Sequence, residues 1–246
     1  LRRQRQMCIR DRRSGIGDNA RILLGGDIEF SSLHTEPDGR IIEIAKTFGT
    51  VSQVVQMRAM LQTPTARKLV ELKAVDNRWP LVGASAISPD IDLAVALADH
   101  AIIADPSLLR SLGLALGNTA RLGDLDIRVS AELVREPDRS ISFVSFGPRV
   151  LISQATLKAT GLQQPGSFIT YRHRLILDKE SDRQAALTAL RDATTDTHVR
   201  VRDLADAAPG FDRFINQAEV FLVLVGLTAL LIGGLGVAGA VRAWLA

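Results

Sequence analysis

Chemically reactive side chains are scarce in this 246-residue sequence. It holds one cysteine, Cys8, along with four histidines and one tyrosine, and aromatic residues make up only 4% of the chain. One cysteine cannot form an intramolecular disulfide, and no two histidines have the H-x-x-x-H spacing of a helix-borne zinc site. We therefore expect no metal site and no cofactor, and a core built from leucine, valine, isoleucine and alanine.

Signatures of nucleotide hydrolysis and of ester hydrolysis are also missing. No Gly-Lys pair occurs, so the phosphate-binding G-x-x-x-x-G-K-[ST] loop is absent, and so is G-x-S-x-G. Four carboxylates in or beside expected strands could do acid–base chemistry, but such charges more often face water: Asp27, Glu29, Glu71 and Asp76. His173 is expected to pack or to form a hydrogen bond. The sequence thus predicts a protein that is not itself an enzyme.

Positive charge is concentrated at the start of the chain. The net charge is +3, yet the first 13 residues hold six arginines against Asp11, a net of +5, which leaves −2 for the rest. The string from Met7 to Arg12 matches a translated sequencing-library adapter, so residues 1–12, Cys8 included, are expected to be an artefact. The alternative is a basic arm that binds phosphate, but we expect no nucleic-acid partner.

Period-two alternation of apolar and polar residues predicts strands in the segment 13–208. It is clearest where Leu125, Ile127 and Val129 alternate with polar residues, and it recurs at three further places, residues 22–30, 55–61 and 171–177. Short helices are expected between the strands. Because strands and helices interleave without a regular βαβ rhythm, the pattern favours an α+β domain.

Capping residues locate two of these helices. Asp105 followed by Pro106 is typical of a helix start, and Gly113 can end that helix. Ser181 and Gln184 fit a capping box before a second helix. Residues 41–48 and 154–160 are weaker helical predictions.

A long uncharged segment lies near the other end of the chain. Residues 220–241 hold no charged side chain over 22 residues, about 33 Å of helix against the roughly 30 Å of a bilayer core. Arg242 and Trp244 follow it, as is typical of a membrane boundary. We predict one transmembrane helix within residues 209–246, continuous with the domain from near Pro209, and a bilayer orientation that leaves the large domain outside the cytoplasm.

The predicted span is rich in small residues. Spacings of four between small side chains let membrane helices pack closely, so other helices are expected to contact Gly226, Gly233, Gly236 and Gly239. The string from Gly234 to Gly239 also matches G-x-G-x-x-G, the signature of a dinucleotide-binding unit. That alternative needs a strand over residues 228–232, and the apolar run is far longer than a strand requires.

A turn-rich segment with proline and glycine is expected between two strands, at residues 136–149. Loops of this kind often carry contacts. We predict that it faces a partner or another domain through Arg139, Phe146 and Arg149.

Several strings, taken in order, resemble one protein family. They are Leu24–Phe30, Val70–Asp76, Trp79–Gly83, Glu136–Arg139, Phe146–Ser153, Ala159–Leu162, Pro165–Ser167, Tyr171–Arg174, and Arg200–Asp203 through Ala208–Gly210 into the glycine-rich span. Their order and spacing resemble the FtsX-like ABC transporter permeases with a MacB-type periplasmic core domain, in particular the YbbP-like branch associated with a lysophospholipase.

The resemblance implies a fragment of a bacterial inner-membrane permease subunit whose domain is periplasmic. Its implied partners are an ABC ATPase subunit, a second permease copy or half, further transmembrane helices, membrane lipid and an envelope hydrolase. The implied function is to couple ATP hydrolysis by the ATPase subunit to export or extraction of a lipid, lipoprotein or peptide. A membrane module that recruits or activates the hydrolase without transport is the alternative.

Overall fold

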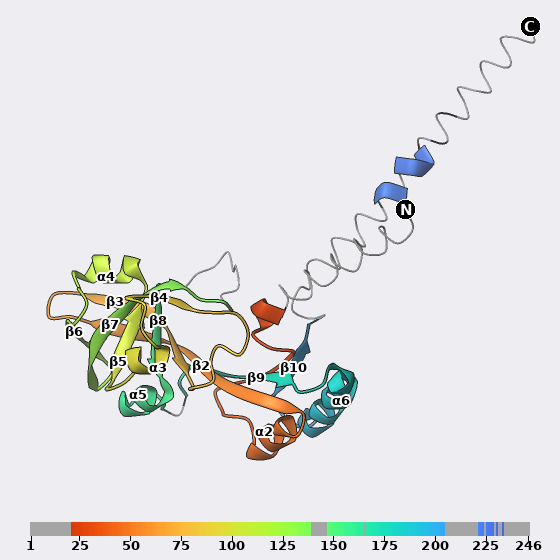
Figure 1. The fold of residues 1–246 in the computed structure, drawn as a ribbon, viewed down its shortest axis with the longest axis horizontal. Coiled ribbons are helices and arrows are strands. Elements are labelled where there is room, and N and C mark those ends of the chain that lie inside the picture. The colour runs from red at the N-terminus through yellow and green to blue at the C-terminus, as the bar shows by residue number, and fades with distance from the viewer. Residues whose placement is uncertain are drawn as a thin grey trace, which may run out of the picture. The chain divides into compact units, whose positions relative to one another are not determined.

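One ten-stranded sheet organises the part of the chain that this computed structural model describes. The described residues are 21–138, 147–164 and 166–204 and, in a C-terminal helix, 221–223, 225–228, 230 and 233. The chain divides into two compact units, residues 1–207 and 208–246. The mixed strand and short-helix architecture predicted for the first unit is confirmed (Figure 1).

After the helical turn at residues 21–24, the described residues of the first unit form ten strands, five α-helices and one 3₁₀ turn. In chain order they are β1 (Ile28–Leu33), α2 (Gly39–Lys46), β2 (Gly49–Gln62), β3 (Arg67–Val75), β4 (Ala86–Ser88), α3 (Leu93–Ala96), β5 (Ala101–Ala104), α4 (Pro106–Leu112), β6 (Thr119–Leu122), β7 (Leu125–Arg135), β8 (Arg149–Ser153), α5 (Gln154–Ala159), β9 (Ile169–Leu177), η1 (Glu180–Asp182), α6 (Arg183–Thr194) and β10 (Arg200–Asp203).

The sheet has two lobes that share two long strands. The first lobe, residues 28–54 and 172–203, has the antiparallel order β10-β1-β9-β2 with α2 and α6 on one face, which is a split βαβ arrangement. The second lobe, residues 55–171, is inserted between β2 and β9 and contains the remaining strands with α3, α4 and α5. Figure 1 shows β2 and β9 running from one lobe to the other.

Three apolar clusters form the core. One lies in the first lobe between the sheet and α2 and α6, and centres on Phe30 and Leu190. The largest lies in the second lobe beneath α4 and α5, around Leu72 and Ile152. The third includes Trp79 and Val54 and lies on the other face of the sheet near the junction of the lobes. Each lobe thus has apolar packing of its own.

The alternation identified most strands, but it began one of them too early in the sequence. Residues 125–133, 55–61 and 171–177 lie in β7, β2 and β9 as predicted. The strand predicted over residues 22–30 is wrong in its first half, because residues 21–24 form a helical turn and β1 begins at Ile28. The turn ends at Gly25, whose positive φ of 76° suits glycine.

The capping predictions had mixed outcomes. Asp105 accepts a hydrogen bond from the Ser107 amide, Pro106 begins α4, and Gly113 ends it in the left-handed conformation, all as predicted. The capping box at Ser181 is wrong: α6 begins at Arg183, and Ser181 lies in the preceding 3₁₀ turn, where its hydroxyl contacts Asp182. The weaker helical predictions at 41–48 and 154–160 correspond to α2 and α5.

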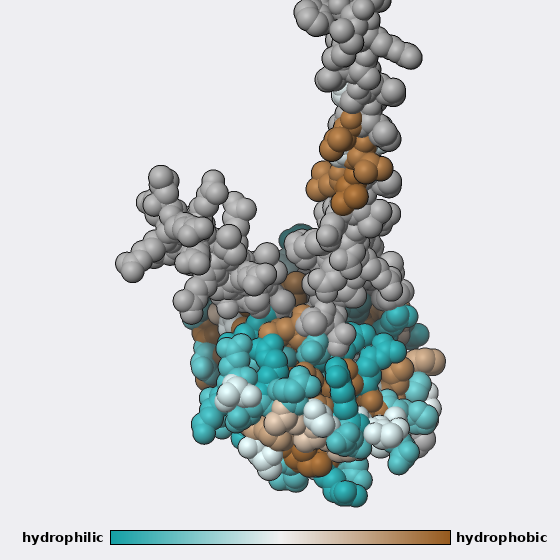
Figure 2. Space-filling view, turned by 90° about the vertical axis from the view of Figure 1, so that its right-hand side faces the viewer, coloured by the Kyte–Doolittle hydropathy of each residue, from teal (hydrophilic) through white to brown (hydrophobic). Residues whose placement is uncertain are grey.

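The described residues of the second unit are helical, and most of them are apolar, as the brown side chains in Figure 2 show. Residues 228, 230 and 233 are helical, which contradicts the strand that a dinucleotide-binding unit needs over residues 228–232. Within the described residues, no helix combines the length and apolarity required to cross a membrane. The span predicted at 220–241 falls largely outside these residues, so it stays a prediction.

Two glycines with positive φ test how closely the chain packs at its turns. Gly123, between β6 and β7, has a φ of 60°, and a Cβ there would lie 2.2 Å from the Thr160 carbonyl oxygen. Gly113 has a φ of 64° but no atom within 4 Å of such a Cβ. Because both replacements incur the same left-handed penalty, we expect Gly113→Ala to lower the free energy of unfolding by about 1 kcal/mol and Gly123→Ala by at least about 2 kcal/mol. Urea denaturation followed by circular dichroism measures both; equal losses would contradict the close approach.

Candidate functional site: a buried chain of charges

Six of the charged residues on β1, β3, β8 and β9 lie on the same face of the sheet. Cross-strand partners share a face, and Glu29 lies opposite Arg174, while Glu71 lies opposite Arg149. The register of β9 with β2 and of β2 with β3 places two more residues, Arg172 and Lys73, on that face. This face, the charged face, is opposite to the one that α2 and α6 cover.

Two further carboxylates reach the charged face from the segment that follows β7. Glu136 and Asp138 are buried, with relative exposures of 8% and 9%. The Lys73 Nζ lies 2.6 Å from Glu136 Oε1 and 2.7 Å from Asp138 Oδ2, and it stands 4.4 Å from the centre of the Trp79 ring. Lys73 itself is 0% exposed. Its ammonium therefore has two carboxylates and an aromatic face as partners in place of water.

The eight residues form an unbroken alternation of acid and base. Arg149 Nε lies 3.2 Å from Glu136, and its Nη2 lies 3.4 Å from Glu71. On the other side of Lys73, Asp138 pairs with Arg174, and Arg174 Nε lies 3.7 Å from Glu29. We call this series the charge chain: Glu71, Arg149, Glu136, Lys73, Asp138, Arg174, Glu29 and Arg172, the last joined to Glu29 at 3.1 Å.

Burial and pairing act on these groups in opposite directions. Burial would raise the pKa of Asp138, but the Lys73 ammonium and the Arg174 guanidinium outweigh it and hold that pKa well below its usual range. Burial lowers the pKa of Lys73, and the carboxylates of Asp138 and Glu136 counteract this effect. The charge chain has four cations and four anions, so its net charge is zero. An arrangement of this kind fixes a segment in place, since removing one member leaves a partner buried without its countercharge.

Asp27, a carboxylate outside the charge chain, holds the segment that precedes β1 against the domain. Asp27 accepts hydrogen bonds from Arg21 Nη2 and from the Leu177 amide, both at 2.9 Å, and its Oδ1 lies 3.8 Å from Arg183 Nη2. It thereby ties the helical turn at residues 21–24 to the end of β9 and the start of α6. This side chain is only 4% exposed.

The expectation that these strand carboxylates face water is wrong. Asp27 and Glu29 are almost fully buried, because arginines on neighbouring segments supply their partners. Asp76, just after β3, is also engaged, accepting hydrogen bonds from the Ser52 hydroxyl and the Gln53 amide. His173 is packed, as expected: its ring stacks on Phe30 at 5.0 Å, and neither ring nitrogen has a hydrogen-bond partner.

The residues predicted to face a partner are only partly described. Arg149 begins β8, and its ion pairs with Glu71 and Glu136 lie within the charge chain. Arg139 and Phe146 lie outside the described residues, and so do Gly236 and Gly239. Gly226 and Gly233 are helical, and a Cβ on either would meet no atom within 4 Å. The sequence predictions did not include Lys73, Arg172 and Arg174; the available signal was the alternation of Glu71 and Lys73 with apolar residues over Val70–Val75.

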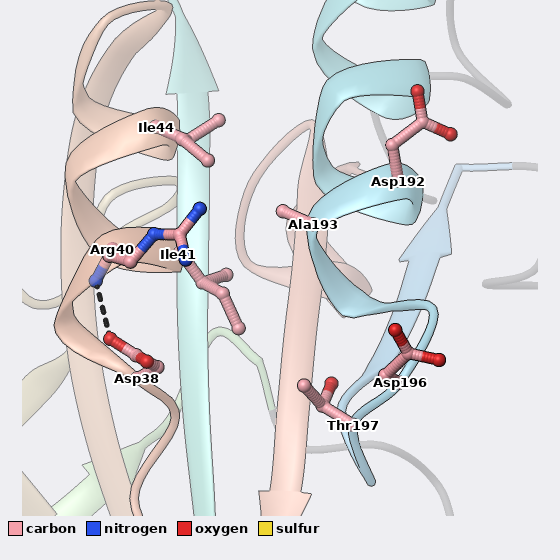
Figure 3. A pocket seen from close by; sticks show the side chains of 8 residues that line it. All are labelled: Asp38, Arg40, Ile41, Ile44, Asp192, Ala193, Asp196 and Thr197. Atoms are coloured by element: carbon pink, nitrogen blue, oxygen red, sulfur yellow. Dashed lines mark hydrogen bonds between the residues drawn. The ribbon is translucent and has the colours of Figure 1, made fainter.

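A shallow groove lies between the two helices of the first lobe. Its volume is about 320 Å³. Figure 3 shows Arg40, Ile41 and Ile44 on α2 facing Asp192 and Ala193 of α6. Asp38, which caps α2 by accepting from the Arg40 amide at 2.9 Å, completes the rim together with Asp196 and Thr197. The groove has an aliphatic floor and a mainly acidic rim.

Removal of one charge tests the charge chain. Lys73→Met takes away the cation between Glu136 and Asp138, so we expect the free energy of unfolding to fall by about 3–5 kcal/mol. The matched control is Arg121→Met, because Arg121 and Asp126 form an exposed pair at 3.6 Å; we expect a loss of at most about 1 kcal/mol. Denaturant titration of both variants measures the difference, and losses of equal size would contradict the assigned role.

The buried histidine generates a pH prediction. Burial lowers the pKa of His173 to about 4, although Asp76 opposes the shift. Between about pH 6.5, the unfolded value, and pH 4 the unfolded state binds a proton that the folded state does not. Stability is therefore complete above pH 6.5 and falls by up to about 3 kcal/mol as the pH drops to 4. The lowered pKa of Asp138 adds a loss only below about pH 4.

The variant His173→Phe isolates this effect. It keeps a ring stacked on Phe30 and removes the titrating group, so its stability should change less between pH 6.5 and 4 than that of the original protein. Urea denaturation at half-unit pH steps gives both profiles. Parallel profiles over this range would show that His173 does not titrate as described.

Comparisons with known proteins agree on one type of relative. No protein-family model matches the chain. It is 27% identical over 160 residues to the uncharacterized ABC transporter permease YbbP of Escherichia coli strain K12, a match that covers 65% of this chain and 20% of that protein. The chain thus spans about a fifth of the length of this relative.

Solved structures show the same fold at low sequence identity. The periplasmic region of MacB from Actinobacillus actinomycetemcomitans matches with a TM-score of 0.52 and 9% identity, over 76% of this chain and 94% of that one. The extracellular domain of the noncanonic ABC-type transporter YknZ from Gram-positive bacteria matches with a TM-score of 0.50 and 11% identity, over 72% and 99%. The chain is therefore a homologue of an ABC transporter permease with a MacB-type periplasmic fold, as its resemblance to the FtsX-like permeases implied.

Proposed function

We propose that this chain is part of the permease subunit of an ABC transporter complex in a bacterial inner membrane. The domain over residues 13–208 is periplasmic, and the span at 220–241 crosses the membrane. The similarity to YbbP and the MacB-type fold support this proposal. The subunit itself has no catalytic role, and a separate ATPase subunit hydrolyses ATP in the cytoplasm.

One structural observation carries the proposal. Strand β1 pairs with β10 in antiparallel register, with Ile28 opposite Asp203. The segment that leads into the domain and the segment that leads out of it therefore lie side by side at one edge of the sheet. A domain held between two membrane helices needs both connections at the same place. Asp27 fastens the incoming segment to β9 and α6, so a displacement there reaches the sheet without loss in a flexible linker.

This arrangement supports a mechanical function. ATP-driven closure of the ATPase partner shifts the membrane helices, and the two adjacent connections move the periplasmic domain. The cargo is a lipid, lipoprotein or peptide that the moving domain extracts or exports. A second permease copy or half and further helices pack on the span, where Gly226 and Gly233 leave room for close approach.

A regulatory function is the second candidate. The groove between α2 and α6 has an aliphatic floor, and its rim carries three carboxylates: Asp38, Asp192 and Asp196. Such a rim suits a basic protein surface better than it suits an acyl chain. In this alternative the domain recruits or activates an envelope hydrolase, and no lipid moves through the complex.

Labelling in cells tests the periplasmic location. Val95 on α3 is 67% exposed, whereas Ala74 on β3 is 0% exposed. In a background where Cys8 is replaced by serine, we expect Val95→Cys to react with a membrane-impermeant maleimide after the outer membrane alone is permeabilised. Ala74→Cys should stay unlabelled and serves as the control. Labelling of Val95→Cys only after the inner membrane is broken would place the domain in the cytoplasm, and it would contradict the proposed periplasmic location.

Co-purification followed by a lipid-release assay separates the two candidate functions. We expect the full-length permease that carries this domain to co-purify from detergent-solubilised membranes with a subunit that hydrolyses ATP. Vesicles containing the purified complex and a fluorescent phospholipid should then lose lipid to an acceptor only when ATP is present. ATP hydrolysis with no cargo release, together with a bound hydrolase, would favour the regulatory function. Absence of any ATPase would contradict the transport function.

A further inference from the structure

Strand β10 adds two arginines to the charged face in the first lobe. The register of β1 with β10 places Arg202 opposite Glu29 and Arg200 opposite Ser31. Cross-strand partners share a face of the sheet, and Glu29 belongs to the charge chain on that face. Arg200 is exposed and Arg202 is half-buried. Among the residues that the structure describes, neither arginine has an ion pair or a side-chain hydrogen bond.

These two cations exceed the charge of the acids beside them. On β9, Arg174 pairs with Asp138, and Arg172 pairs with Glu29, whose side chain is only 3% exposed. The Arg172 side chain keeps an exposed fraction of 31% in spite of that contact. Together with the two arginines of β10, these groups make four cations and two anions. This part of the charged face therefore presents a surplus of two positive charges to its surroundings.

The exposed arginines lie around one small side chain and beside an apolar one. Ser31 has Arg200 opposite it on β10 and Arg172 opposite it on β9. We call Arg172, Arg200 and Arg202 the arginine surface. Leu33, two residues further along β1 and so on the same face, is 61% exposed. Guanidinium groups form paired hydrogen bonds with phosphate oxygens, and an aliphatic border beside cations is typical of surfaces that lie at a lipid headgroup layer.

The strands that carry the arginine surface include those nearest in sequence to the expected membrane connections. β10 is the last described element of the first unit, and the span predicted at 220–241 follows it. β1 is the first strand of the domain and pairs with β10. Attraction between an arginine and anionic lipid fades within about 10 Å in salt solution. Only cations close to the bilayer can therefore contribute, and the chain order favours these.

We propose that the arginine surface binds the phosphate groups of anionic phospholipids in the outer leaflet of the inner membrane. Arg200 and Arg202 make the main contacts, Arg172 adds its exposed edge, and Leu33 faces the layer beneath the headgroups. Bound lipid then holds the first lobe at the bilayer in a defined orientation while the membrane helices move. The inference rests on the proposed membrane location of the chain and adds a lipid-binding surface to it.

Fluorescence quenching in lipid nanodiscs tests the contact. The full chain, with Cys8 replaced by serine, carries an apolar fluorophore on Leu33→Cys, so the position stays apolar. One set of discs contains phosphatidylcholine alone and the other also contains phosphatidylglycerol, and both contain a lipid with a spin-labelled headgroup as quencher. We expect quenching to be stronger by a factor of about 2 in the anionic discs. The double variant Arg200→Gln/Arg202→Gln should be quenched equally in both.

Two controls accompany this measurement. Arg67→Gln/Lys68→Gln removes two exposed cations from β3 in the second lobe, and we expect it to keep the difference between the discs. A fluorophore on Glu43→Cys, exposed on α2 over the opposite face of the sheet, should be quenched equally in both.

Three results would overturn the proposal. They are equal quenching of the Leu33 label in the two kinds of disc, a difference that survives in the double variant of β10, and loss of the difference in the double variant of β3. The first of these would leave the arginine surface to an acidic protein partner. The maleimide experiment tests the periplasmic location separately, so either proposal can fail without the other.

Discussion

The ionic contact between Lys73 and the two carboxylates of the segment after β7 is the constraint on which the domain depends. A fully buried ammonium is tolerated only with countercharges at hydrogen-bond distance, and Glu136 and Asp138 supply them at 2.6 and 2.7 Å. Because Arg174 also binds Asp138, the same contact joins the two lobes. Residues 136–138, after β7, are consequently held against the sheet.

The pairing of the surrounding strands places the other members of the charge chain. Parallel pairing of β3 with β8 brings Arg149 beside Glu71 and within reach of Glu136. Antiparallel pairing of β1 with β9 brings Glu29 beside Arg174. The helices α2 and α6 cover the opposite face, which is apolar apart from His173 and a few small polar groups. In the first lobe the sheet thus separates an apolar cluster from the charge chain, and the start of β1 and the end of β10 lie side by side at its edge.

Much of the fold was predictable from the sequence, because it follows from local chemistry. Alternation identified β2, β7 and β9, and the Asp105, Pro106 and Gly113 signals located both ends of α4. The 3₁₀ turn before α6 was not predictable from Ser181, since a capping box and a turn require the same residue types. The buried state of Asp27 and Glu29 was not predictable either, because a polar strand face has the same pattern whether it meets water or arginines. The arginines that pair with Glu29 are about 145 residues away in sequence, as its contact with Arg174 shows.

The coupling between Asp138 and Arg174 tests the central claim most directly, because this pair is where the charge chain crosses between the lobes. A double-mutant cycle with Asp138→Asn, Arg174→Gln and the double variant, followed by urea denaturation, gives their interaction free energy. If the charge chain holds the lobes together, the coupling should be favourable and of the order of 1–3 kcal/mol. The stability losses of the two single variants would then add up to more than the loss measured in the double variant. A coupling near zero would show that the two side chains are merely neighbours, and it would contradict the account.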